Sequence, residues 1–222
     1  MTERYLVIDC ATPALSIALF DDDALIASSH AELGRGHAEA LLPAIAALPE
    51  GGRCGRILVD VGPGSFTGVR VGVAAAVSLG FGWAVPVEGY GCLDLVASMA
   101  RERLAPKNDF AVVMVGGHGE LFWAIAPASA DSPVQAAPLA IQSTPIETLA
   151  GMIDVQLIVG SGAQILLDAG APGRAVPLLP DAREALRLPL LQRQRKPVPD
   201  YGRGADAKPM AAARVRTPVE VR

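Results

Sequence analysis

Short apolar runs and stretches of helical periodicity alternate along the first half of the chain. YLVIDC, LSIALF and ALIASSH are three β-rich runs, separated by ATPA and by the acidic turn DDD. Runs of this length and composition, bounded by turn residues, are typical of strands joined as hairpins. Residues 5–30 are therefore predicted to form a three-stranded antiparallel meander.

Helices and strands are predicted to alternate after this meander. Residues 37–48, HAEALLPAIAAL, have the apolar spacing of a helix. RILVDVG predicts a buried strand, which leads through a glycine-rich loop into a helix over residues 67–83. A short strand, VPVEGY, and a helix over residues 92–104 complete this half. The order predicts a first α/β domain over residues 1–105.

The second half repeats this order in outline. FAVVMVGG and ELFWAIA are apolar runs joined by a glycine-rich turn, and VQAAPLAI is expected to supply a third strand. A short helix over residues 144–152, the strand VQLIVGS and a Gly- and Pro-rich stretch over residues 170–180 follow. No sequence identity survives between the halves, so we predict a smaller second domain over residues 106–191 that shares the architecture without a sequence repeat.

Composition and charge restrict the possible function classes. The chain has 222 residues, of which 51% are hydrophobic, and a formal net charge of −4. It is long enough for one sizeable core or two modest ones, and it lacks the broad basic surface that holds nucleic acid. The N-terminal segment MTERYLVIDC has neither a basic leader nor a long apolar stretch, so we expect a cytoplasmic protein without a signal peptide or membrane span.

The cysteines and the C-terminal charges add two further expectations. Cys10, Cys54 and Cys92 form no CxxC, which predicts reduced thiols and neither a disulfide framework nor a zinc site. From residue 192 onward, eight basic residues stand against three acidic ones. Residues 192–222 are therefore predicted to be a basic, solvated and partly disordered tail.

The loop VGPGSFTGVRVG, residues 61–72, stands where a phosphate-binding loop would stand in an α/β protein. A Walker A loop needs a lysine followed by Ser or Thr after its last glycine, but Val and Arg follow here. The dinucleotide fingerprint GxGxxG also fails, because the spacing is GxGxxxG. What remains is a helix N-terminus capped by Ser65 or Thr67, which could attract an anion or be an ordinary capped turn.

Small residues recur along the helix that follows the loop. Gly68, Gly72, Ala76 and Gly80 stand four residues apart, so they share one face and leave a groove that another element can approach closely. An interior glycine costs roughly 1 kcal/mol of helix stability relative to alanine, which implies a compensating close contact. The pattern alone leaves open whether this contact lies within the chain, against residues 37–48, or between two molecules.

Few residues suit catalysis. His30, His37 and His118 form no HxxxH or HExxH pair, and no cysteine or carboxylate cluster has metal-ligand spacing, so a metalloenzyme is not expected. The chain has no GxSxG elbow, although residues distant in sequence can assemble a triad. Asp9 ends the first strand, where it could meet a nucleotide-bound magnesium ion or cap the following turn.

Four segments together resemble the TsaB (YeaZ) family, the bacterial partner subunits in the synthesis of N6-threonylcarbamoyladenosine on tRNA. They are VIDCATPALSIAL, GRGHAEALLPAI, VGPGSFTGVRVGVAAAVSLGFGWAVPV and PDYGRGADA. The block GPGSFTGxRxG is highly specific to that family. The likeness is looser in the second half, where the last segment carries it through Pro199, Tyr201, Arg203, Asp206 and Ala207.

The resemblance implies the α/β fold of actin, sugar kinases and Hsp70 ATPases (the ASKHA fold), with two related domains that each open on a β-meander. It also implies that a catalytic relative, TsaD, transfers the threonylcarbamoyl group to adenosine 37 of tRNAs that read codons beginning with A. TsaD carries a metal-binding HxxxH after the strand that corresponds to AVPVEGY, whereas this chain reads GCLDLVASMA there. VMVGG also replaces the DxR-like residues usual in the second meander. The resemblance thus implies a catalytically silent paralogue without an intrinsic cofactor.

By the same resemblance, the helix after the loop and the helix over residues 37–48 would pair with the equivalent helices of TsaD, and the chain would form homodimers when TsaD is absent. TsaE would join the complex, and tRNA would be contacted indirectly. ATP or ADP with magnesium would bind only at a site shared with partners, near vestigial contacts from Asp9, Thr12, Gly64 and Ser65. The expected partner interface comprises His37, Leu41, Ile45, Gly68, Arg70, Gly72, Ala76 and Gly80.

Two other function classes stay open. A stand-alone nucleotide-binding ATPase would use Asp9, Thr12 and the glycine loop, and calorimetry with ATP and magnesium would reveal it. A glycoprotease-like hydrolase would need a metal pair or an assembled nucleophile that the sequence does not show. Hydrolysis inhibited by a chelator would indicate this second class.

Overall fold

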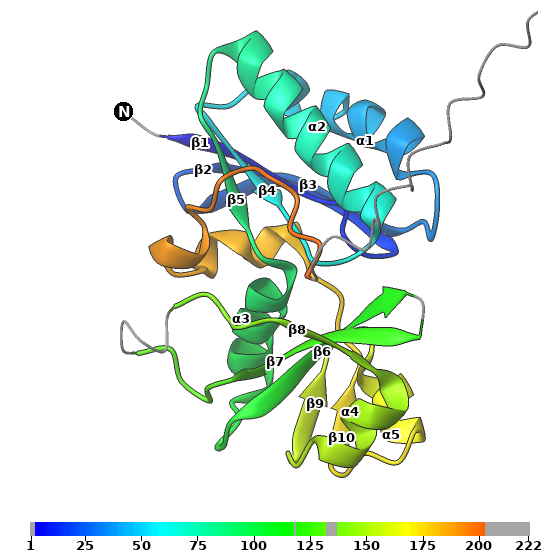
Figure 1. Ribbon diagram of the computed structural model, residues 1–222. Helices are drawn as coiled ribbons and strands as arrows, with labels where there is room; N and C mark the ends of the chain where they lie inside the picture. Colours follow the sequence, from blue (N-terminus) through cyan, green and yellow to red (C-terminus); the bar gives the residue numbers. More distant parts are fainter. Residues whose placement is uncertain (1–2, 118, 132–136, 203–222) are drawn as a thin grey trace, which may run out of the picture.

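The structure is a computed structural model that describes residues 3–117, 119–131 and 137–202. It consists of two sheets with helices packed on them, one from each half of the chain (Figure 1). His118, Arg203, Asp206 and Ala207, which the sequence singled out, lie outside the described residues.

The first sheet has the strand order β3-β2-β1-β4-β5. β1 pairs antiparallel with β2 and β2 with β3, which confirms the predicted meander. β4 joins β1 in parallel, and β5 joins β4 in parallel. The strands are β1 (Arg4–Asp9), β2 (Ala14–Asp21), β3 (Ala24–Glu32), β4 (Arg56–Asp60) and β5 (Val87–Tyr90).

Two helices cover one face of this sheet (Figure 1). They are α1 (His37–Ala46), which a 3-10 turn, η1 (Pro49–Gly52), follows, and α2 (Phe66–Trp83). Among the described residues, α2 alone is long and apolar enough to cross a membrane, yet its buried side packs against the sheet as in a domain helix. α3 (Cys92–Leu104) leads into the second sheet, and its Leu93 shares a core cluster with Phe110 there.

The second sheet has the order β10-β9-β6-β7-β8, the same arrangement of first to fifth strands as in the first sheet. β6, β7 and β8 pair antiparallel, whereas β9 and β10 add in parallel on the other side of β6. The related architecture predicted for the two halves is therefore confirmed. The elements are β6 (Phe110–Gly117), β7 (Glu120–Ala126), β8 (Gln142–Pro145), α4 (Ile146–Met152), β9 (Leu157–Val159), α5 (Ala163–Asp168) and β10 (Arg174–Val176).

The third strand of the second sheet lies later than predicted. The described part of the run VQAAPLAI, residues 137–141, is not a strand, and β8 begins at Gln142. The Leu139 amide instead donates to the Asp94 carboxylate of α3 at 2.8 Å. Trp123 Nε1 of β7 donates to Thr144 Oγ1 of β8 at 2.9 Å. A polar contact therefore helps to hold β8 on the sheet, whereas the apolar residues before it lie against α3.

The chain returns to the first half near its C-terminal end. η2 (Ala182–Arg187) packs on the face of the first sheet opposite α1 and α2, where Ala182 shares a cluster with Val7 and Leu58. From the end of η3 (Leu190–Gln192), residues 192–202 return to the first sheet, where Arg195 bridges Gly89 of β5, and we call this segment the strap. The predicted domain end at residue 191 therefore does not separate the halves, because η2 and the strap both contact the first sheet.

Backbone and side-chain bonds fix the strap, so the prediction of a partly disordered tail is wrong for residues 192–202. The Gly89 amide donates to the Arg195 carbonyl at 2.7 Å, and the Arg195 amide donates back at 3.0 Å. The Arg195 guanidinium donates to the fully buried carboxylate of Asp94. Burial raises the pKa of Asp94 to about 6, although the charge of Arg195 opposes this. Residues 203–222 lie outside the described residues.

Candidate partner-binding face and interdomain cavity

The glycine loop places the start of α2 directly on the turn between β1 and β2. The Ser65 amide donates to the Ala11 carbonyl at 2.7 Å, and Ser65 Oγ accepts from the Gly68 amide at 3.2 Å, which makes Ser65 the N-cap. A Cβ atom on Gly64 would lie 2.1 Å from the Ala11 carbonyl oxygen. The loop therefore needs glycine because its backbone touches the backbone of the neighbouring turn.

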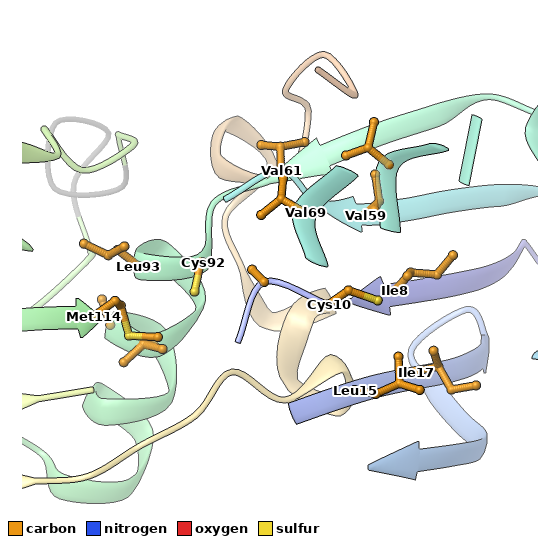
Figure 2. Packing of buried hydrophobic residues seen from close by; sticks show 14 of the residues in the cluster. Ile8, Cys10, Leu15, Ile17, Val59, Val61, Val69, Cys92, Leu93 and Met114 are labelled. Atoms are coloured by element: carbon orange, nitrogen blue, oxygen red, sulfur yellow. The ribbon is translucent and has the colours of Figure 1, made fainter. Parts of the chain in front are cut away.

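The stripe of small residues on α2 faces the chain's own sheet. A Cβ on Gly68 would lie 2.0 Å from the Cys10 carbonyl oxygen, and one on Gly80 would lie 2.3 Å from Val87 Cγ2. Gly72 is buried against Cys10, and Ala76 is fully buried. The expectation that these four residues contact a partner is therefore wrong: they allow the helix to approach the sheet. Figure 2 shows the same layer, with Val69 of α2 near Cys10.

The predicted interface residues of α1 are buried in the same way. His37, Leu41 and Ile45 are buried, and Leu41 and Ile45 belong to the core beneath the helices. Their spacing marks the inner side of an amphipathic helix, which the sequence pattern alone cannot distinguish from a docking side. Of the eight residues expected at the interface, Arg70 alone is exposed.

The opposite side of α2 is exposed and largely apolar. Phe81 is 91% exposed, Phe66 55% and Val77 45%. These residues lie on one side of the helix with Arg70 and Ala74, and Leu42 of α1 is also exposed. Contiguous exposed apolar patches mark interaction sites. We call the surface formed by Phe66, Arg70, Ala74, Val77 and Phe81 the outer face. Its sequence signal was the set of large side chains opposite the glycines.

An aromatic cluster ends the outer face at the start of α2. The Arg70 guanidinium carbon lies 3.5 Å from the centroid of the Phe66 ring and 5.6 Å from that of Tyr201. Arg70 Nε donates to the Tyr201 hydroxyl at 3.1 Å. The two ring centroids are 5.2 Å apart. Tyr201 belongs to the strap, so the site combines segments that lie 131 residues apart in sequence.

A cavity of about 510 Å³ opens between the two halves beside this cluster. Thr12, Gly64 and Ser65, three of the four residues expected near a nucleotide, line it together with aromatic and small residues. None of the described lining residues carries a charge. Magnesium ions in proteins are usually held by carboxylate oxygens, and the described lining residues offer none. The lining comprises Ala11, Thr12, Pro13, Gly34, Gly64, Ser65, Phe66, Met114, Val115, Gly116, Phe122, Ser161 and Tyr201.

Asp9, the fourth of those residues, does not reach the cavity. It is fully buried, and its carboxylate accepts from the Tyr90 hydroxyl at 2.9 Å and from the Ala11 amide at 3.3 Å. Asp60, at the end of the adjacent strand, is buried beside it and accepts from the Gly62 amide at 2.7 Å. Burial, followed by the charge of Asp9, raises the pKa of Asp60 well above its usual value. The expected magnesium contact from Asp9 is therefore replaced by a carboxyl pair inside the sheet.

The remaining candidate groups are dispersed or buried. Within the described residues, no three His, Cys, Asp or Glu side chains stand close enough to hold a metal ion. Cys10, Cys54 and Cys92 are free thiols. Burial raises the pKa of Cys54 to about 11 and that of Cys92 well above its usual value, so both thiols are weak nucleophiles at neutral pH.

Part of the sequence matches a known protein family and two curated proteins. Residues 28–133 match the family model described as TsaD, tRNA N6-adenosine threonylcarbamoyltransferase. The TsaB protein of Escherichia coli (strain K12) is 34% identical over 129 residues, which cover 54% of this chain and 54% of that protein. TsaB of Bacillus subtilis (strain 168) is 33% identical over 103 residues, covering 43% and 44%. The chain thus matches about half the length of these curated relatives.

Solved structures extend the similarity beyond that half. YeaZ from Pseudomonas aeruginosa has a TM-score of 0.68 and 26% sequence identity, covering 84% of this chain and 90% of the other. A second structure from that organism, described as similar to peptidase YeaZ, has a TM-score of 0.69 and 26% identity, covering 84% and 89%. These similarities confirm the resemblance to the TsaB (YeaZ) family and the predicted α/β fold of two related halves.

Proposed function

From its resemblance to the TsaB (YeaZ) family, we propose that this chain takes part in N6-threonylcarbamoyladenosine synthesis on tRNA as a non-catalytic partner subunit that binds and supports TsaD. The observation that carries the proposal is the outer face of α2. Phe81, which is 91% exposed, lies with the exposed Phe66 and Val77 on one side of the helix, and a contiguous exposed apolar patch of this kind marks an interaction site. The partner contact therefore uses the outer face and not the glycine stripe.

The chemistry is assigned to TsaD because this chain offers little for it. The segment GCLDLVASMA forms the N-cap and the first nine residues of α3, and it holds no histidine. Asp94 of that segment binds the strap through Arg195. The interdomain cavity has no charged side chain among its described lining residues. These features favour a structural role over an ATPase or a glycoprotease-like hydrolase.

The other members of the assembly follow from the same proposal. TsaE joins the complex, tRNA is contacted through it, and ATP or ADP with magnesium binds only where partner residues complete a site. Without TsaD, two copies cover their outer faces with each other as a homodimer in the cytoplasm, since a two-fold contact needs a self-complementary patch.

Charged substitutions on the outer face test the proposal. Phe81→Arg and Val77→Asp place a charge on exposed positions, so both variants should fold while losing affinity for purified TsaD by roughly 30-fold or more, as expected of interface hot spots. Calorimetry measures the affinity, and thermal unfolding monitors the fold.

Ile165→Arg is the matched control. Ile165 is 40% exposed on α5, the helix of the second half that corresponds to α2. The Ile165→Arg variant should bind TsaD with the same affinity as the wild type. Unchanged binding by both outer-face variants would remove the basis of the proposed function.

A further inference from the structure

We infer that Arg70 selects the partner at the outer face: it receives a carboxylate from the docked helix and so favours an acidic partner over a second copy of this chain. The inference rests on the proposed function, since it concerns the same surface. It adds that the partner must present a carboxylate opposite Arg70.

The Arg70 side chain is held in place before any partner arrives. Its guanidinium lies on the Phe66 ring at 3.5 Å, and its Nε donates to the Tyr201 hydroxyl at 3.1 Å. This use of Nε leaves the two terminal amino groups for an end-on, bidentate bond to a carboxylate. An arginine fixed by stacking loses less side-chain freedom on binding than a free one.

The strap supplies this rigidity. The Asp200 amide donates to the Val61 carbonyl at 2.7 Å, at the first residue of the glycine loop. The Gly202 amide donates to Asp200 Oδ1 at 2.9 Å, which closes a turn around Tyr201. Tyr201 is therefore anchored on both sides, and its hydroxyl fixes the position of Arg70.

Arg70 lacks an acidic partner among the described residues. No ion pair involves it, and α2 contains no Asp or Glu over its 18 residues. Its neighbours on the outer face are apolar. A helix docked on this face would remove water from the guanidinium, and a charge taken out of water needs an opposite charge to compensate it. The partner is therefore expected to present Asp or Glu opposite Arg70.

A second copy of the chain does not supply this group from α2. A two-fold contact brings the same surface from both molecules, so it adds a second Arg70 to the interface. Glu39, in the first turn of α1, is the one carboxylate on the two helices. Between two α2 helices the charges of the two Arg70 residues repel, so Arg70 favours a partner whose facing helix carries Asp or Glu over a second copy of α2.

Charge reversal separates these outcomes. We expect Arg70→Glu to weaken binding to purified TsaD by about tenfold or more and to change the homodimer dissociation constant by less than about threefold. Arg70→Lys should weaken TsaD binding by an intermediate factor, because lysine keeps the charge but not the planar stack on Phe66. Calorimetry with TsaD and sedimentation equilibrium of the isolated chain provide the two constants, each at low and high salt.

Arg53→Glu is the matched control. Arg53 also lies over an aromatic ring, that of Trp83 at 5.9 Å, but Trp83 lies outside the outer face. This variant should bind TsaD as the wild type does. Equal TsaD binding by Arg70→Glu and the wild type would overturn the inference, and so would a homodimer weakened as much as the heterodimer. Failure of the wild type itself to bind TsaD would instead reject the proposed function.

Discussion

The two halves of the molecule share one topology and differ in the helix that follows the fourth strand. In both sheets the third, second, first, fourth and fifth strands lie in this spatial order. The helix after the fourth strand is α2, with 18 residues, in the first half and α5, with 6 residues, in the second. The long helix carries an apolar outer face, whereas the short one offers Ile165 as its one exposed large hydrophobic residue. The helix after the fourth strand is thus long enough to carry a row of exposed apolar residues in the first half, whereas its counterpart in the second half is not.

The close approach of these helices to their sheets is common to both halves. A Cβ on Gly68 would lie 2.0 Å from the carbonyl oxygen of Cys10, just after β1. A Cβ on Gly160, just before α5, would lie 2.2 Å from the carbonyl oxygen of Val113 in β6. Glycine at the start of the helix is therefore a requirement of the fold and carries no information about partners.

The largest expected effect tests this shared requirement. Gly68→Ala and Gly160→Ala should each lower the free energy of unfolding by about 3 kcal/mol, because neither backbone contact can yield without moving a strand. Gly160 has in addition a φ of 113°, which disfavours any side chain. Urea unfolding measures the loss.

Gly82→Ala is the control for both variants. A Cβ on Gly82 meets nothing within 4 Å, so this change should raise the stability by about 0.5–1 kcal/mol through helix propensity. Gly72→Leu and Ala76→Arg should likewise damage the fold, since both side chains would enter the core. Normal stability of Gly68→Ala would contradict the assignment of the stripe to the sheet.

The halves also differ in what covers the outer strand of each sheet. β5 is bridged by the strap at Arg195, whereas β10 has no further strand beside it among the described residues. Arg195→Ala should lower the stability by about 2 kcal/mol at pH 8, because the buried carboxylate of Asp94 loses its cation. The penalty should shrink at pH 5, where Asp94 is protonated.

The sign of this pH dependence follows from the pKa of Asp94. Its folded value of about 6 lies above the ordinary 3.8, so the wild type loses stability as the pH rises through this window. The charge of Arg195 lowers the pKa of Asp94, so the Arg195→Ala variant should have a higher Asp94 pKa. It should therefore lose stability up to a higher pH than the wild type does. Urea titrations of both proteins at pH 5 and pH 8 compare the two losses. An equal loss at both values would show that Asp94 does not hold the strap.

A smaller effect on the pH dependence of stability is expected from the residues that follow the paired parts of β1 and β4, which differ from those at the same place in β6 and β9. The first half buries Asp9 and Asp60 there, whereas the second has Val113 and Gly160 next to the paired residues of β6 and β9. The raised pKa of Asp60 means that the folded chain keeps a proton that the unfolded chain has lost, so stability falls as the pH rises above the ordinary value of 3.8. Asp60→Asn cannot ionise, so its urea midpoint should fall less with pH than that of the wild type. Parallel pH profiles for the two proteins would show that the raised pKa of Asp60 does not contribute to the pH dependence of stability.

The sequence predicted most of the topology because hydrophobic spacing reports secondary structure directly. It predicted the first meander, the first two strands of the second, and the helices over residues 37–48, 67–83 and 92–104, but placed the third strand of the second meander too early. α5 and β10 escaped detection because six and three residues are too few to show a period. The strap escaped because its contacts join Arg195 to Asp94, 101 residues apart, and Tyr201 to Arg70, 131 residues apart.

The candidate site was harder to predict than the fold. The four-residue spacing from Gly68 to Gly80 correctly indicated a close contact, but spacing cannot tell a sheet of the same chain from a foreign helix. The outer face was readable as the large apolar residues Phe66, Val77 and Phe81 opposite the glycines. The pattern alone does not show that this side is exposed, because burial depends on which side of α2 meets the sheet.

Site-specific photo-crosslinking to TsaD tests the central claim most directly. Benzoylphenylalanine would replace Phe81 of α2 in one sample and Ile165 of α5 in the other, and each would be irradiated with purified TsaD. If α2 docks through its outer face, the probe at position 81 crosslinks to TsaD and the probe at position 165 does not. Crosslinking at position 165 but not at 81 would contradict the account.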